Sequence, residues 1–327
     1  MISLWNGITT YWRDAWGAWD RFWFSPSDPS TLSAIRLFTG AMLFYTHFVW
    51  SFDLWAFFGP EGWLPLELHS LDRNPGVGVT RYHIPIFEWL GSPWQVWLVH
   101  IIALGVMFCL MIGLFSRTTA VLAAILALAY VGRVTPGAFF GLDKVNCMLA
   151  MYLALGPCGA RYSVDRLWRI RRGKNISREP SVMANVAIRL IQLHLCVIYF
   201  SSGLGKLEGI TWWTGEAIWL SVANLEYQSL DMTWLGHFPW LMNLLGFTTL
   251  FWELFYAFLV WPRFTRPWVL AIAVGVHGFI SLSMGMITFG LAMLIANFSF
   301  ISPDTTRRLM DPIASRVSLA IVGEKVE

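Results

Sequence analysis

Charged residues are scarce in this chain of 327 residues, because Asp, Glu, Lys and Arg together make up only 13%. Soluble globular domains carry about 25% charged residues. This scarcity excludes a disordered chain, a nucleic-acid binder and an ordinary cytosolic enzyme. The four cysteines have no C-x-x-C spacing, so we expect neither a disulfide framework nor a metal site. The sequence also has no internal repeat and no low-complexity tract.

Apolar residues are abundant instead. They make up 56% of the chain, and its mean hydropathy is +0.55. Several windows approach or exceed the ~20 apolar residues that cross a bilayer. We expect spans at 32–57, 93–115, 118–135, 144–157, 185–205, 239–262, 268–282 and 286–301. The sequence therefore predicts an all-α integral membrane protein with about eight transmembrane helices, in contact with membrane lipid.

The N-terminal segment has a different pattern. Trp5, Trp12, Trp16, Trp19 and Trp23 recur at helical spacing, with charged residues between them. This is typical of an amphipathic helix that lies in the membrane interface, with its indole rings among the headgroups. The predicted domains are an interfacial helix at 1–25, a transmembrane domain at 26–302 and a short amphipathic or disordered cytoplasmic tail at 303–327.

The positions of the basic residues predict the orientation of the chain. Segment 158–184 contains seven arginines and lysines, and such loops stay cytoplasmic under the positive-inside rule. Eight spans then place both termini inside, and the long outer loops are 58–92 and 206–238. This arrangement favours a multi-pass protein of the bacterial inner (plasma) membrane.

Lys206 is the strongest candidate among the ionisable residues of the spans. It lies near the outer end of the fifth span, after the small residues Ser202, Gly203 and Gly205, which permit close approach by a helix or a ligand. Desolvation disfavours the ammonium form, so a lysine in an apolar site can serve as a general base. The alternative is an interfacial lysine whose amine extends to water.

Other ionisable groups occur deeper in the spans. His277 and His194 lie near the middle of theirs, where a neutral imidazole can contact a substrate oxygen or make a bond between helices. Glu253 needs a partner, for which Arg189 and His194 are candidates. Arg36 lies near the cytoplasmic end of its helix, from which its side chain can extend to water. A fold is needed to choose among these alternatives.

Four stretches of the sequence resemble those of the HTTM family, whose membrane domain is shared with vitamin K-dependent γ-glutamyl carboxylases. The stretches are Asp20–Trp23 with Leu32–Gly40, Arg161–Asp165, Val197–Leu207, and His277 with Ser283–Phe289. The third stretch is the most specific, because a Tyr-Phe pair, a cluster of small residues and a Lys-Leu pair follow in order. The resemblance spans most of residues 20–302.

The resemblance implies an activity and a set of site residues. Lys206 matches the lysine regarded as the base that deprotonates vitamin K hydroquinone, and His277 would assist through an oxygen contact. The cofactor is then vitamin K hydroquinone or another quinol, with O₂ and CO₂ as reactants. The implied class is a carboxylase- or epoxidase-like lyase, or an oxygenase. We expect the lipophilic substrate to be bound by Asp143, Asn146, Tyr199 and His194.

Two departures from the carboxylases argue against a protein substrate. The carboxylases have a large lumenal domain that binds a propeptide, and we expect none in a chain of this length. They also have a functional histidine near the start of the fourth span, where this chain has Asp143, Lys144 and Asn146. A quinol or another lipophilic small molecule remains compatible with the shared lysine.

Two alternatives belong to other functional classes. The first is haem-based electron transfer, because His47 with His100 and His194 with His277 have similar estimated depths and can each form a ligand pair. The second is a non-catalytic transporter or scaffold, because a break at 283–285 between the last two spans resembles the interrupted helices of transporters.

Overall fold

The computed structural model describes residues 2–71, 84–133, 140–173 and 179–322. Within these residues every regular element is a helix, and the only β contact is an isolated bridge between Ser27 and Ser181. The predicted all-α class is confirmed. Parts of the predicted outer loop at 58–92 and of the basic segment at 158–184 lie outside the described residues.

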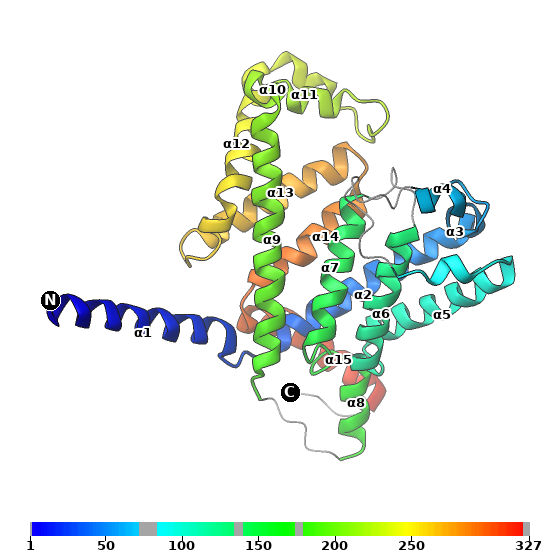
Figure 1. Ribbon diagram of the computed structural model, residues 1–327, viewed down its shortest axis with the longest axis horizontal. Coiled ribbons are helices and arrows are strands. Elements are labelled where there is room, and N and C mark those ends of the chain that lie inside the picture. Colours follow the sequence, from blue (N-terminus) through cyan, green and yellow to red (C-terminus); the bar gives the residue numbers. More distant parts are fainter. Residues whose placement is uncertain (1, 72–83, 134–139, 174–178, 323–327) are drawn as a thin grey trace. The chain divides into compact units, whose positions relative to one another are not determined.

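The chain forms two compact units, one of Met1–Val134, Leu149–Leu190 and Ile301–Glu327, and one of Thr135–Met148 and Ile191–Phe300. The helices of the first unit are α1 (Ile2–Phe24), α2 (Ser30–Trp50), α3 (Leu54–Phe58), α4 (Leu66–Leu71), α5 (Pro93–Ile112), α6 (Ser116–Arg133), α8 (Val164–Arg171) and α15 (Pro303–Val322) (Figure 1). The helices of the second unit are α10 (Ile210–Thr214), α11 (Ala217–Val222), α12 (Pro239–Leu259), α13 (Arg266–Ser283) and α14 (Ile287–Asn297). Helices α7 (Gly141–Leu155) and α9 (Val182–Glu208) contribute residues to both units. Short 3₁₀ turns occur at Ser51–Asp53, Ile86–Trp89, Thr233–His237 and Phe298–Phe300.

Within the described residues, five helical segments are long and apolar enough to cross a membrane. A sixth is obtained only when two consecutive helices near the C-terminus are counted as one broken span. The five are Ser30–Phe58, Pro93–Ile112, Val182–Glu208, Pro239–Leu259 and Arg266–Ser283. Each of the eight predicted spans coincides with a helix, but a count of eight crossings is not confirmed. Helices α7 and α14 have 15 and 11 residues, which at 1.5 Å per residue is well short of a hydrocarbon core of about 30 Å.

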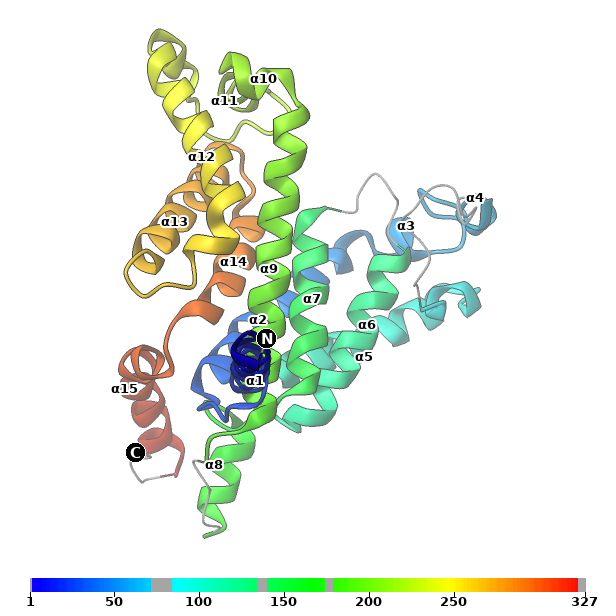
Figure 2. The same cartoon turned by 60° about the vertical axis from the view of Figure 1, so that its left-hand side comes forward.

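In the first unit, α2 packs along α5, and α5 packs along α6 (Figure 2). Arg36 joins these elements, and its position corrects the expectation that its side chain extends to water, because it is fully buried. Its guanidinium donates to the backbone carbonyls of Leu110 at 2.7 Å and Met111 at 2.8 Å, and also to that of Tyr162. The carbonyls at the end of a helix have no partner inside that helix, so Arg36 caps the C-terminus of α5.

From Pro303 to Val322, the C-terminal segment is a helix. Helix α15 packs against α2 and α8, and Arg307 binds the carboxylate of Asp28 at 2.9 Å. The hydroxyl of Tyr162 donates to Asp311 at 2.8 Å, and Arg161 lies 3.5 Å from both Asp28 and Asp311. These contacts attach α15 to the rest of the first unit.

In the second unit, α13 and α14 pack against each other as a helical hairpin (Figure 1). The break predicted at 283–285 is confirmed: α13 ends at Ser283, and Gly285 has a φ of +67°, which favours glycine. Ser229 donates from its backbone N–H to the Ser283 carbonyl at 3.0 Å and from its hydroxyl to the Leu282 carbonyl at 2.6 Å. The segment before α12 therefore supplies bonds that the end of α13 lacks.

The predicted outer loop at 206–238 is largely helical. Helices α10 and α11 and the turn at Thr233–His237 gather near α12 (Figure 2). They enclose a small apolar core of Ile218, Val222, Leu235 and Met242. The loop thus forms a folded cap on the second unit.

Candidate functional site

Helix α9 presents a row of polar side chains to its neighbours in the second unit. Tyr199, Ser202 and Lys206 are three and four residues apart, a spacing that puts them on one helical face. All three are bonded along this face, to α12, to α13 or to each other. The site is built from this row.

At the end of the row, the Lys206 ammonium is held by two acceptors. Its Nζ donates to Ser202 Oγ at 2.7 Å and to Glu253 Oε2 at 2.6 Å. The side chains of Lys206 and Glu253 are only 20% and 9% exposed, and the ring of Trp212 lies 5.2 Å from the amine. Lys206 is therefore the partner of Glu253. The sequence-based candidates, Arg189 and His194, were wrong.

Two helical turns along the same face, a second network surrounds Tyr199. Its hydroxyl lies 2.7 Å from His277 Nε2 and accepts from Asn297 Nδ2 at 2.8 Å. The Tyr256 hydroxyl donates to Asn297 Oδ1 at 2.7 Å, and Asn297 Nδ2 also donates to the Met293 carbonyl. These bonds determine the orientation of the amide. They are all satisfied if Tyr199 donates its proton to Nε2, which leaves the proton of a neutral His277 on Nδ1.

Three buried polar side-chain atoms of the second unit make no hydrogen bond within the part of the chain that the structure describes. They are His277 Nδ1, Asn146 Oδ1 and Ser299 Oγ. A buried polar atom without a partner costs about 1–3 kcal/mol, so each is a place where a bound molecule can supply a partner. With the tautomer above, His277 offers a donor and Asn146 an acceptor.

The start of α7 lies close to the histidine. A Cβ on Gly141 would be only 2.8 Å from the ring of Phe289, and that ring is centred 5.9 Å from the ring of His277. Two and five residues along from Gly141, Asp143 and Asn146 are buried, at 8% and 3% exposure. Burial raises the pKa of the Asp143 carboxyl to about 6.

The buried Asp143 carboxyl leads to a prediction about pH. Because its folded pKa lies above the ordinary value of 3.8, its contribution to stability is fully present below about pH 4 and is lost as pH rises through about 6. Asp143→Asn removes this dependence, so we expect the variant to gain up to about 3 kcal/mol over the parent protein at pH 8 and little at pH 4. Thermal melts of the detergent-solubilised protein across this range measure the difference. The exposed Asp231→Asn serves as the control, and an equal gain there would contradict the assignment.

His194 does not share the face of Lys206. The two residues are twelve positions apart on α9, which rotates one from the other by about 120° around a helix of 3.6 residues per turn. His194 is half-buried. The structure thus places Tyr199, Ser202 and Lys206 in one row on α9 and joins His277 to this row through Tyr199. It brings the first residue of α7, Gly141, next to Phe289, which lies beside His277. It leaves His194 on another face of α9.

Sequence reasoning missed two members of the network, Asn297 and Tyr256. Both are buried and connect α14 and α12 to Tyr199. A neutral amide or phenol buried in an apolar helix needs hydrogen-bond partners, just as an ionisable group does. Asn297, which ends the apolar run of α14, carried a signal that a wider search would have found.

Of the two histidines proposed as haem ligands in the first unit, His100 is bonded at both ring nitrogens and His47 at one. His100 bonds the Tyr130 hydroxyl through Nδ1 at 2.7 Å and Ser51 Oγ through Nε2 at 2.9 Å. His47 bonds the Leu43 carbonyl through Nδ1 at 2.7 Å. In this arrangement, His100 has no free nitrogen with which to bind iron.

Gly203 sets the spacing between α9 and α12, as the cluster of small residues predicted. A Cβ there would lie 2.9 Å from Leu254 Cγ and 3.1 Å from its backbone nitrogen. We expect Gly203→Ala to push the two helices apart and to lower stability by about 1–3 kcal/mol, as measured by thermal unfolding in detergent. Gly205→Ala is the matched control, since nothing lies within 4 Å of its Cβ position. Equal stability of the two variants would contradict the close contact.

Comparison with known proteins identifies the family. The model of the HTTM domain matches residues 24–305, which is most of the chain. No curated protein and no solved structure matches it. Together with the apolar helices, this match makes the chain an integral membrane protein with a domain like that of the vitamin K-dependent carboxylases. The chain belongs to the HTTM family.

Proposed function

We propose that the second unit acts on a quinol or another lipophilic substrate, with Lys206 as the base. The observation that carries the proposal is the 2.6 Å pair between Lys206 and Glu253, which joins two helices long and apolar enough to span a membrane. Ionisable residues in such segments are costly and usually serve a function. The family match supports the same substrate class, because the related carboxylases use a lysine to deprotonate vitamin K hydroquinone.

The pair provides a route for the proton. Burial in a medium of low dielectric constant penalises both charges of the pair, and this penalty favours passage of a proton from the ammonium of Lys206 to Glu253. The neutral amine then takes the proton of a quinol hydroxyl. The net transfer is one proton from the quinol to the carboxylate, and Lys206 returns to its charged state. The deprotonated quinol supplies the reductant for O₂.

Neighbouring groups orient the substrate. His277 donates from Nδ1 to a quinol oxygen, and its ring is held through Nε2 by Tyr199. Asn297 and Tyr256 hold Tyr199 in turn. Asn146 and the carboxyl of Asp143 accept from hydroxyl groups of the substrate. The apolar surroundings exclude water, which would otherwise quench a basic oxygen anion.

The proposed location is the bacterial inner membrane, with both termini in the cytoplasm and the Lys206 end of α9 on the outer side. The support is the distribution of charge, because the basic segment at 158–184 immediately precedes α9. A lipophilic quinol reaches such a site from the bilayer.

The test is O₂ uptake by the purified full-length protein in lipid nanodiscs, with vitamin K hydroquinone as the added quinol. We expect uptake above quinol autoxidation for the parent protein and none for the double variant Lys206→Met/Glu253→Gln, which removes both charges and leaves neither unpaired. Glu208→Gln is the matched control, because this carboxylate is on the same helix end and exposed.

The outcomes separate the parts of the proposal. Full activity in the double variant would overturn the role of Lys206. Quenching of tryptophan fluorescence by the quinone without O₂ uptake would keep the lipophilic site but exclude the oxygen-dependent reaction. A parent protein that neither binds nor oxidises the quinol would overturn the proposal as a whole.

A further inference from the structure

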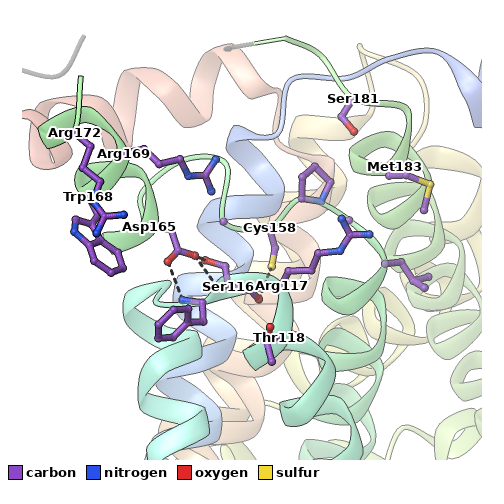
Figure 3. A pocket seen from close by; sticks show the side chains of 15 residues that line it. Ser116, Arg117, Thr118, Cys158, Asp165, Trp168, Arg169, Arg172, Ser181 and Met183 are labelled. Carbon is purple, nitrogen blue, oxygen red and sulfur yellow. Dashed lines mark hydrogen bonds between the residues drawn. The ribbon is translucent and has the colours of Figure 1, made fainter. Parts of the chain in front are cut away.

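A second candidate site lies in the first unit, apart from the network of Lys206. It is a cleft of about 590 Å³ among the start of α6, the end of α7, α8 and the start of α9 (Figure 3). Its basic residues are Arg117, Arg169 and Arg172. In Figure 3, the guanidinium groups of Arg117 and Arg169 lie on either side of Cys158.

The charge of the cleft favours an anion. Three arginines line it against one aspartate, Asp165, which gives a net formal charge of +2. The Asp165 carboxylate is already occupied, because it accepts from the backbone N–H of Phe115 at 2.8 Å and from both the N–H and the hydroxyl of Ser116 at 2.7 Å. Burial raises the pKa of the Cys158 thiol to about 11, so no thiolate repels an anion.

The three arginines differ in whether a neighbouring side chain holds the guanidinium. Arg172 lies over the ring of Trp168, with its central carbon 4.1 Å from the ring centroid, so its plane is held by a cation–π contact. Within the part of the chain that the structure describes, Arg117 and Arg169 form no ion pair, and both are exposed. Two free guanidinium groups that flank one space match the geometry with which arginine binds phosphate oxygens in pairs.

The level of the cleft in the fold suggests the source of the anion. It lies where the apolar helices α6 and α9 begin and α7 ends, which is the level of lipid headgroups if these helices are in the bilayer. Phe115, Leu155 and Met183 are large apolar side chains exposed at the cleft, and they fit the chain of an amphiphile. Basic pockets among transmembrane helices on the cytoplasmic side bind anionic lipids in other membrane proteins.

We propose that this cleft binds a phosphate ester, through Arg117 and Arg169, with Arg172 and Trp168 as its outer wall. The same chemistry is present in the headgroup of an anionic phospholipid and in a free phosphate ester. The two sources differ in one respect. The lipid carries an apolar chain that can contact the apolar side chains of the cleft, and the free ester carries none.

The test is native mass spectrometry of the full-length protein in detergent, titrated with phosphatidylglycerol or phosphatidylcholine, with glycerol 3-phosphate as the competing free ester. At about 1 kcal/mol for each basic residue, or about fivefold in affinity, Arg117→Gln/Arg169→Gln should weaken phosphatidylglycerol binding at least tenfold. The matched control is Arg171→Gln/Arg308→Gln, which removes two exposed arginines that do not line the cleft. Binding to the control should stay within twofold of the parent protein. Because the four arginines are exposed, melting temperatures should agree among all three proteins.

Each outcome decides for or against the site. Preference for phosphatidylglycerol that glycerol 3-phosphate does not abolish assigns the cleft to a lipid headgroup, whereas displacement by glycerol 3-phosphate assigns it to a free ester. Equal loss in the two double variants would mean that only the total charge matters, and this would overturn the proposal. Parent protein that does not distinguish phosphatidylglycerol from phosphatidylcholine and does not bind glycerol 3-phosphate would also overturn it.

Discussion

Lys206→Met is expected to lower the free energy of unfolding by about 3–5 kcal/mol, because it leaves the carboxylate of Glu253 buried without its partner. Glu253 is 9% exposed and lies 2.6 Å from the amine, so little water is available to replace the lost charge. Adding Glu253→Gln should restore most of the loss, since the double variant buries no unpaired charge. Unfolding titrations in mixed detergent micelles measure both steps, and Glu208→Gln, at an exposed position, should change stability by less than about 0.5 kcal/mol.

A stability of Lys206→Met equal to that of the parent protein would show the protonation state of Glu253. If Lys206→Met unfolds like the parent protein, then Glu253 is already protonated in the folded state and the ion pair is not what holds α9 to α12. This would contradict the prediction on stability. The proposed chemistry needs the neutral pair to be reachable, and its own test is the loss of O₂ uptake in the double variant.

Arg36→Leu is expected to cost about 3 kcal/mol or more. The guanidinium donates hydrogen bonds to the backbone carbonyls of Leu110, Met111 and Tyr162. A leucine at this position would leave all three carbonyls without this donor. Hydrogen bonds from charged groups contribute about 1.5–3 kcal/mol each, and removal of the charge returns part of this sum because the buried guanidinium is no longer desolvated. The same unfolding titrations apply.

Two controls sharpen this prediction. Arg36→Lys keeps the charge but replaces the planar guanidinium with a single ammonium group. Its free energy of unfolding should therefore fall below that of the parent protein, but by less than in Arg36→Leu. Arg13→Leu removes an arginine whose side chain is 78% exposed, and it should change stability by less than about 0.5 kcal/mol. If Arg36→Leu is as stable as Arg13→Leu, the proposed cap on α5 is wrong.

Local signals located the candidate residues but did not pair them. Lys206 stood out because a charge in an apolar run is costly wherever the run packs. Its partner Glu253 is 47 residues away, and His277 is 78 residues from Tyr199. No periodicity links positions so far apart, so the sequence could not test Arg189 and His194 as partners of Glu253. Position along a helix does not determine which face a side chain occupies.

The predicted number of crossings is not confirmed, for a related reason. Hydropathy detects apolar runs, and each of the eight runs is a helix in the structure. The length of an apolar run does not show how many of its residues form the helix and how many form the turns at its ends. Helix α14 has only 11 residues. Arg117 and Arg133 also lower the mean hydropathy of α6, which is not among the five candidate spans.

The sequence by itself determined the helical class, the membrane character, the break before α14 and the family, because each depends on residues that are neighbours along the chain. Only the tertiary structure decided that Lys206 is bonded to Glu253, that Tyr199 connects His277 to Asn297, and that Arg36 is buried as a cap and does not reach water. These outcomes depend on which helical faces meet. That choice comes from packing summed over many contacts, which no short stretch of sequence contains.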